Sequence, residues 1–484
     1  MQKIIKLVND CQFVLPHNKQ TSFHLKQLAG IGRFPHQVNA AERFEPQTLS
    51  QCGIVHIQAL SEKLYYNNIQ RNCMNRITGG INCEKKMAKL RAFMRTQKAV
   101  SSAFRNGTPM MAAMGWAVFL YAAVSLILPL HLSWSWKIAC FALLAVVAQK
   151  NVLFEKFGGG MFFAPELPQA LLIGAAWLYN ALIIMLVLLL FKDAALILWK
   201  IGVRRPFPVQ SSALLITALS LGLSLYGTWA ALKVPAVVTH EVTLDRLPPQ
   251  FDGLKIALLS DLHASAMNTA PLLQSVVDKT NELNADVVLL SGDMVDGTVK
   301  HREHDTAPLA QLRAAYGVWG VSGNHEFYSG YTDWLEKFKE LGITMLENDC
   351  AVIEKGGAQL FIAGVPDAHG ARFGFAAPNA EGVLKGIPRD SCVVLIEHNP
   401  VRARQNAALG VSLQLSGHTH GGMMPVLDRI IGRMNGGFLR GWYTVAGMKL
   451  FVSPGTLLWN GFPLRLCVPS EISLIVLRSP ASAV

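Results

Sequence analysis

The sequence predicts an α/β domain in its second half, preceded by a helical membrane region. Three observations lead to this prediction. Hydrophobic residues make up 51% of the 484 residues and charged residues only 16%, an excess that indicates membrane segments rather than a larger core. Long uncharged apolar runs all lie before residue 235. After residue 254, short apolar runs alternate with helical stretches, as in an α/β domain.

The net charge of +12 is divided unevenly between the two halves. Residues 1–235 carry 24 Lys+Arg and 8 Asp+Glu, which gives +16, whereas residues 236–484 carry 20 and 24, which gives −4. The basic excess therefore belongs to the half with the apolar runs, where basic flanks set membrane topology. We expect no nucleic-acid partner. The eight cysteines are scattered without a C-x-x-C pair, which favours neither a zinc ribbon nor a disulfide framework.

Residues 1–86 show no sustained helical or strand period and no signal-peptide pattern. We interpret them as a poorly defined, weakly ordered cytoplasmic extension. The alternative is that the natural start is Met87, since a short basic stretch and then an apolar span follow it.

Residues 87–235 form the predicted transmembrane region. About 20 apolar residues cross the hydrocarbon layer of a bilayer. Three uncharged runs have this length, and a fourth is weaker because it contains Lys137. The expected spans are residues 109–130, 132–149 (the weak one), 167–191 and 211–232.

The topology follows from the basic flanks at residues 85–105 and 192–210, which belong in the cytoplasm. Both lie there if residues 132–149 are re-entrant or interfacial, so that three spans remain and the C-terminal domain is extracytoplasmic. If all four runs cross, the domain is cytoplasmic. We favour the first solution, in an integral membrane protein of a bacterial inner or plasma membrane.

Residues 236–484 form the predicted α/β domain. A linker is expected between Val234 and Pro249. Strands are expected at residues 254–259, 286–290, 316–321, 360–365, 392–396 and 411–415, and helices at 270–284 and 332–341.

Five short polar motifs, called phrases below, directly follow apolar runs. In α/β domains the loops at strand ends converge on a common site. The phrases are Asp261-Leu262-His263, Gly292-Asp293-Met294-Val295-Asp296, Gly323-Asn324-His325-Glu326, His398, and Gly417-His418-Thr419-His420. A site for two metal ions needs a carboxylate to bridge them and several further oxygen or nitrogen donors. Imidazole suits zinc and iron, whereas carboxylate and amide oxygens suit manganese and magnesium. The phrases supply seven such donors: Asp261, His263, Asp293, Asn324, His398, His418 and His420.

These phrases resemble the signature of the calcineurin-like metallophosphoesterases, D-x-H, G-D-x-x-D, G-N-H-[DE], H and G-H-x-H, over roughly residues 250–478. The bacterial membrane-anchored branch is the most similar, through Gly323–Tyr328, Gly417–Gly422 and a tail at Pro469–Leu474. The resemblance implies a four-layer α-β-β-α sandwich of two packed sheets flanked by helices.

The resemblance also implies the roles of the donors. Asp261, His263 and His420 bind one metal ion, Asn324, His398 and His418 bind a second, and Asp293 bridges the two. The ions are Mn, Fe or Zn, and a bridging hydroxide attacks phosphorus. Asn324 stabilises the phosphoryl charge, His325 donates a proton to the leaving group, and Asp296 and Glu326 support the ligands.

The expected function is a membrane-anchored phosphoesterase that acts on phosphodiesters or phosphomonoesters, either soluble or lipid-linked. The alternatives are a catalytically silent scaffold or sensor on the same fold, and a transporter with an appended domain. The intact donor set argues against the scaffold, and the absence of charges in the three strong spans argues against an ion path. Residues 423–443 mix apolar residues with arginines, so they form either a lip that meets lipid headgroups or a loop packed on the domain.

Overall fold

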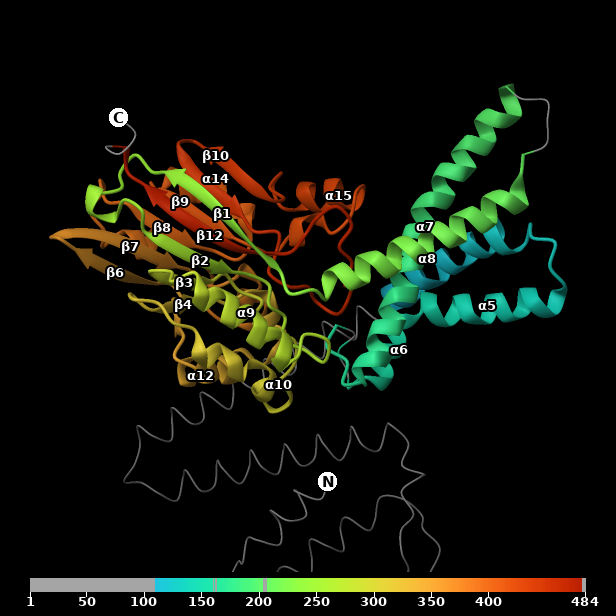
Figure 1. The fold of residues 1–484 in the computed structure, drawn as a ribbon, viewed down its shortest axis with the longest axis horizontal. Coiled ribbons are helices and arrows are strands. Elements are labelled where there is room, and N and C mark those ends of the chain that lie inside the picture. The colour runs from blue at the N-terminus through green and yellow to red at the C-terminus, as the bar shows by residue number, and fades with distance from the viewer. Residues whose placement is uncertain (1–108, 160, 162, 203–206, 481–484) are drawn as a thin grey trace, which may run out of the picture. The chain divides into compact units, whose positions relative to one another are not determined.

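The computed structural model describes residues 109–159, 161, 163–202 and 207–480 (Figure 1). Residues 1–86 and the basic stretch at 85–105 lie outside this range, so the predictions for them stay predictions. The described residues all belong to one compact unit.

Three described helices are long and apolar enough to cross a membrane, namely Pro109–Ile127, α7 (Gln169–Gly202) and α8 (Val209–Ala231). The first ends in a π-helical turn, η1 (Ala123–Ile127). They correspond to the three strong predicted spans. The structure extends α7 well beyond the predicted end at residue 191, and Lys192 and Asp193 form an ion pair of 2.8 Å within the extended part. Asp193 also accepts hydrogen bonds from Tyr121 and Ser125 of the first helix, at 2.7 and 2.6 Å.

The weak fourth run, residues 132–149, forms α5 (Trp134–Ala148), and the next helix, α6 (Lys150–Phe157), follows it at an angle of 61°. Such a pair is either a broken span or a re-entrant loop. Both of the predicted topologies therefore remain open.

The second half contains two six-stranded mixed sheets. The first has the order β1-β12-β2-β3-β4-β5 and the second β10-β11-β9-β8-β7-β6. The strands of the first sheet are β1 (Ala236–Thr243), β2 (Lys255–Leu259), β3 (Val287–Leu290), β4 (Val318–Gly320), β5 (Thr344–Met345) and β12 (Glu471–Arg478). Those of the second are β6 (Asp349–Lys355), β7 (Ala358–Gly364), β8 (Val393–Ile396), β9 (Leu413–Ser416), β10 (Gly441–Val445) and β11 (Met448–Val452).

The two sheets pack face to face, because apolar side chains from both fill one shared core. Ile256 and Leu289 come from the first sheet, Val394 and Leu413 from the second, and all four are fully buried. Helices cover the two outer faces and complete the predicted four-layer sandwich. They are α9 (Ala270–Glu282), α10 (Val299–Thr306), α12 (Tyr331–Glu340), α13 (Ala380–Leu384) and α14 (Ala403–Ala408). Two further helices lie elsewhere: α11 (Asn324–Ser329) follows β4 directly, and α15 (Leu427–Met434) packs on a separate cluster with α7 and α8.

The expected linker after Val234 is wrong in its first part, because residues 236–243 form the strand β1. This strand pairs in parallel with β12, from Ala236 opposite Glu471 to Thr243 opposite Arg478. Most of its side chains are exposed or half-buried, so the sequence carries no continuous apolar run there. Its partner is the last strand of the chain, and local sequence does not reveal such a pairing.

The membrane helices pack directly on the domain. Asn180 of α7 donates a hydrogen bond to the Pro463 carbonyl oxygen (2.9 Å), and the buried Lys150 of α6 donates one to the Gly461 carbonyl oxygen (2.9 Å). Gln169, at the start of α7, donates to the Met267 carbonyl oxygen at 3.0 Å. The domain is therefore docked on these helices through buried polar contacts.

Candidate metal centre

The predicted donors lie together at the ends of five strands. β2, β3 and β4 of the first sheet lead into the phrases at residues 260–263, 292–296 and 323–326. β8 and β9 of the second sheet lead into His398 and the loop 417–422. Neighbouring strands among these are parallel within each sheet, so their carboxyl ends meet at one edge of the sandwich.

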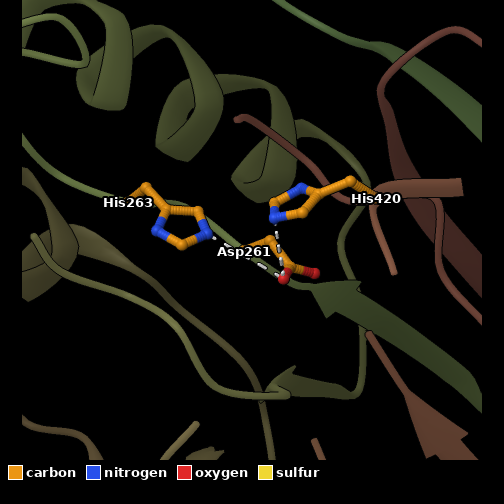
Figure 2. A group of neighbouring side chains, drawn as sticks. All are labelled: Asp261, His263 and His420. Atoms are coloured by element: carbon orange, nitrogen blue, oxygen red, sulfur yellow. Dashed lines mark ion pairs between the residues drawn. The ribbon is translucent and has the colours of Figure 1, made fainter. Parts of the chain in front are cut away.

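The first group of donors contains Asp261, His263 and His420, whose ligand atoms all lie within 4.8 Å of one another (Figure 2). Asp261 Oδ1 is 4.0 Å from His263 Nε2 and 3.6 Å from His420 Nε2. All three side chains are buried. Carboxylate and imidazole donors at this spacing suit zinc, iron or manganese.

The second group contains Asp293, His398 and His418. His398 Nε2 lies 3.1 Å from Asp293 Oδ2 and 3.2 Å from His418 Nδ1. His398 Nδ1 lies 2.7 Å from the Ser291 carbonyl oxygen, to which it donates, and this contact leaves Nε2 free to act as a ligand.

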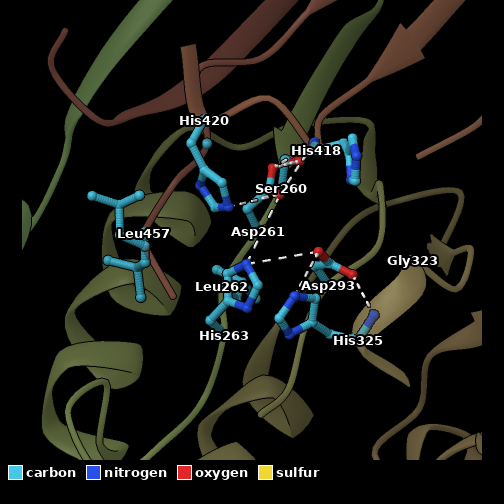
Figure 3. A network of polar contacts seen from close by, with 12 residues as sticks. Ser260, Asp261, Leu262, His263, Asp293, Gly323, His325, His418, His420 and Leu457 are labelled. Atoms are coloured by element: carbon cyan, nitrogen blue, oxygen red, sulfur yellow. Dashed lines mark hydrogen bonds and ion pairs between the residues drawn. The ribbon is translucent and has the colours of Figure 1, made fainter. Parts of the chain in front are cut away.

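Asp293 lies between the two groups. Its Oδ2 atom is 3.8 Å from His263 Nε2 of the first group (Figure 3). The same atom is 3.1 Å from His398 Nε2 of the second group. Asn324 starts α11 and is held beside this carboxylate, because the next backbone N–H, that of His325, donates to Asp293 Oδ1 at 2.8 Å.

The electrostatics of the two groups differ. Burial alone would raise the pKa of Asp293, but the neighbouring His398 holds it well below its usual range. Burial lowers the pKa of His418 to about 4, with a further contribution from His398. Burial also lowers the pKa of His420 well below its usual range. Burial alone would lower the pKa of His398, but the Asp293 carboxylate raises it well above its usual range. His418 and His420 are therefore neutral imidazoles, as metal binding requires, whereas His398 would have to release a proton to bind a metal ion.

His325 and Asp296 border the two groups. His325 Nδ1 lies 2.5 Å from Asp296 Oδ1, and the same oxygen lies 3.2 Å from His263 Nδ1. Burial alone would lower the pKa of His325, but the carboxylates of Asp293 and Asp296 raise it to about 9. His325 is therefore a cation near neutral pH, with Nε2 3.9 Å from Asp293 Oδ2.

Glu326 joins two of the site loops. Its carboxylate accepts hydrogen bonds from the backbone N–H groups of Asp293 (3.1 Å), Met294 (2.6 Å) and Gly323 (2.7 Å). The carboxylate is fully buried beneath the site. This position matches the supporting role that was predicted for it.

The backbone at the site is strained. Five of the eleven non-glycine residues with positive φ in the described chain are predicted ligands: Asp261, His263, Asp293, His418 and His420. This conformation is costly for residues with a side chain, and it concentrates at functional sites. Gly417 has a different constraint, because a Cβ atom there would lie 2.4 Å from Asp261 Oδ2.

Two buried ligand atoms fit a bound metal ion. His263 Nε2 and Asn324 Oδ1 have no hydrogen-bond partner within the described part of the chain. An unsatisfied buried polar atom costs roughly 1–3 kcal/mol, and coordination would remove that cost.

Two residues at the site were not predicted. Phe163, from the segment between α6 and α7, lies edge-on to His325, and Arg465 donates from Nη1 to the His420 carbonyl oxygen at 2.8 Å. Neither belongs to a motif, and both reach the site from segments distant in sequence. Only the tertiary structure brings them there.

Comparison with known proteins agrees with this architecture. The model of the calcineurin-like phosphoesterase family matches residues 254–422. A transmembrane protein with metallophosphoesterase domain from Bos taurus is 31% identical over 368 residues, which cover 70% of this chain and 82% of the bovine protein. The chain belongs to the calcineurin-like metallophosphoesterases.

Two further relatives show how far this similarity extends. A transmembrane protein with metallophosphoesterase domain from Danio rerio is 34% identical over 55% of this chain, which spans 62% of the zebrafish protein, less than two thirds of its length. A metallophosphoesterase from Helicobacter pylori is 31% identical over 53% of this chain and 67% of its own length. Because vertebrate proteins are among the relatives, the expected restriction to a bacterial branch is not borne out. The relatives' names and the three apolar helices together indicate that this metallophosphoesterase is a membrane protein.

Proposed function

We propose that this metallophosphoesterase is a membrane-anchored hydrolase that cleaves phosphodiester or phosphomonoester bonds at a centre of two divalent metal ions. The observation that carries the proposal is the position of Asp293, whose Oδ2 atom lies within 4 Å of a histidine from each donor group. A carboxylate between two sets of donors is the arrangement that two neighbouring cations require.

The resemblance to the family implies how the residues would divide between the two ions. Asp261, His263 and His420 would hold one ion, Asn324, His398 and His418 would hold the other, and Asp293 would contact both. When bound, such ions supply a hydroxide near neutral pH and offset the charge of the phosphoryl oxygens.

The remaining chemistry belongs to His325. Its hydrogen bond to Asp296 fixes the orientation of the ring, and Nε2 holds a proton at the border of the site. A leaving-group oxygen that approaches this face accepts that proton as the ester bond breaks. Asn324 binds a phosphoryl oxygen through its amide.

The test uses the full chain in detergent, because the domain is docked on its membrane helices. After chelation, turnover of p-nitrophenyl phosphate and bis-(p-nitrophenyl) phosphate is measured with Mn²⁺, Fe²⁺ or Zn²⁺ added back. We expect metal-dependent turnover of at least one ester. Loss of a residue that only supports a metal ligand typically lowers kcat/KM by roughly 10- to 100-fold. We expect Asp293→Ala to lower kcat/KM by more than this.

The matched control is Asp278→Ala, which removes an exposed carboxylate from α9 and should leave turnover unchanged. Turnover that survives chelation, or that is equal in the two variants, contradicts the proposal. No turnover of either ester with any of the three metals, in protein that unfolds cooperatively, favours the scaffold alternative.

A further inference from the structure

The helix α15 has apolar side chains on two sides. On one side, Leu427 and Ile431 pack against a hydrophobic cluster that includes Met423 and Met424. On the other side, Val426, Ile430 and Met434 follow one another at intervals of four residues and are 46%, 52% and 76% exposed. A helix on the surface of a water-soluble domain would place polar residues on this second side.

Exposed arginines flank the apolar stripe. Arg429 and Arg433 lie on the same helix next to Ile430 and Met434. The one acidic residue of the helix, Asp428, accepts a hydrogen bond from the Arg429 backbone N–H at 2.7 Å. Apolar side chains bordered by arginines are typical of helices that lie in the headgroup layer of anionic membranes.

The residues at the end of α8 indicate where the headgroup layer lies along this helix. Tyr226 and Trp229 are more than half exposed there, and Lys233 Nζ lies 4.4 Å from the centre of the Trp229 ring. Aromatic residues with a neighbouring lysine are enriched at membrane–water interfaces. Residues 226–233 therefore lie at the interface.

Contacts through residues 465 and 466 connect the end of α8 to the segment that leads into α15. The Arg465 backbone N–H donates to the Gly227 carbonyl oxygen of α8 at 3.0 Å, and the Leu466 backbone N–H donates to the Met423 carbonyl oxygen at 2.9 Å. Ala231, the last residue of α8, belongs to the same buried cluster as Leu427 and Ile431. The end of the spanning helix therefore fixes α15 beside the bilayer.

The same elements reach the metal centre. The turn η6 (His420–Gly422) directly precedes Met423, and Arg465 donates to the His420 carbonyl oxygen. The predicted ligand His420 is thus only a few residues from a helix held at the membrane surface.

We infer that α15 lies in the headgroup layer of the bilayer that α7 and α8 cross, with Val426, Ile430 and Met434 in lipid and Arg429 and Arg433 on anionic headgroups. The site then faces the phosphoester headgroups of lipids in that leaflet, which are its substrate class. The substrate part of this inference rests on the proposed hydrolase function, whereas the position of α15 does not.

The position of α15 is tested without activity. The full chain is placed in nanodiscs of phosphatidylcholine and phosphatidylglycerol that carry a diazirine on one acyl chain, and adducts are mapped by mass spectrometry after illumination. We expect adducts on residues 426–434 as well as on α8, and none on β6 at the opposite edge of the second sheet. Labelling of α8 without labelling of 426–434 overturns the inference, and so does equal labelling of 426–434 and β6.

The substrate class is tested with the double variant Ile430→Glu/Met434→Glu. Its matched control is Val352→Glu on β6, where the valine is 45% exposed. Phosphate released from phosphatidic acid and glycerol released from phosphatidylglycerol in nanodiscs are compared with turnover of the soluble p-nitrophenyl esters. We expect a loss of about tenfold or more on at least one lipid, equivalent to about 1.4 kcal/mol, with soluble esters and the control unchanged.

The outcomes separate the two proposals. If the parent protein hydrolyses soluble esters but neither lipid, or if the double variant hydrolyses lipid as well as the control does, the substrate inference is wrong and the hydrolase function stands. If the parent hydrolyses nothing, the hydrolase function and the substrate class fail together. Photolabelling decides the position of α15 in either case.

Discussion

The ring of Phe163 meets the imidazole of His325 edge-on, with the two ring centroids 4.9 Å apart. Phe163 is almost fully buried and comes from the segment that joins α6 to α7. Tyr328 and Trp459 also lie within about 6 Å of the His325 ring, at centroid distances of 5.7 and 6.0 Å. The segment that precedes α7 therefore lines one side of the candidate metal centre, and aromatic rings surround the expected proton donor.

Replacement of Phe163 should impair turnover without removing metal. Phe163→Ala opens one side of the His325 ring to water and frees its orientation, so we expect kcat to fall about tenfold, since small displacements of catalytic groups cost up to 100-fold. Metal content by mass spectrometry should stay at the parental level. Phe157→Ala, which removes a ring that is 66% exposed on α6, is the matched control. Unchanged kcat in Phe163→Ala would show that the ring fills space beside His325 without affecting turnover.

The role of His325 predicts a dependence on the leaving group. His325→Gln removes the proton donor, so turnover of alkyl phosphoesters should fall by about 10²- to 10⁴-fold. Esters of p-nitrophenol, whose oxygen leaves without protonation, should lose much less. Metal content should not change. Equal losses on both kinds of ester would contradict proton donation by His325.

Loss of His418 or His420 should lower metal occupancy and activity together. Each is predicted to bind a different ion, so His418→Ala and His420→Ala should each reduce the bound metal towards one ion per chain. Metal analysis after gel filtration measures this directly. The fold and membrane insertion should be little affected, which thermal unfolding and membrane fractionation check. A variant that keeps two ions would refute its ligand assignment.

The buried Lys150 should stabilise the docking of the domain on the helices. Besides its hydrogen bond to Gly461, its Nζ atom lies 4.4 Å from the centre of the Tyr179 ring. Lys150→Met leaves the Gly461 carbonyl oxygen without its donor, at a cost of about 1–3 kcal/mol. A lower thermal midpoint in detergent is therefore expected. Lys156→Met, at an exposed position on the same helix, should not move the midpoint.

The topology prediction is tested with reporters fused after residue 210 and at residue 484. With three spans, the first fusion reports the cytoplasm and the second reports the extracytoplasmic side. This result follows from two basic flanks on the same side of the membrane. A cytoplasmic signal from residue 484 would instead favour four spans, with α5 and α6 as one broken span.

The strands that were predicted from the sequence have both faces buried. β2, β3, β8 and β9 read as short apolar runs, and each ends in a polar phrase that the structure brings to the site. β1 and β10 are edge strands with exposed or half-buried side chains, so they leave no such run. The partner of β1 is the distant strand β12, whereas β10 pairs with β11, which follows it directly.

The site shows the same division. The candidate ligands were predictable because each stands in a short phrase directly after a strand. Phe163 and Arg465 were not, because their contribution lies in a tertiary contact rather than in a motif. The bend between α5 and α6 is a further example, since composition gave a weak span and only packing gives the 61° angle.

The pairing of β1 with β12 has a consequence for biosynthesis. β1 leaves the ribosome directly after α8, whereas β12 is made only after every other strand of the first sheet. β12 is also the antiparallel partner of β2, so the first sheet stays open between β1 and β2 until β12 has been made. The helices that precede β1 can therefore enter the bilayer well before the sandwich closes.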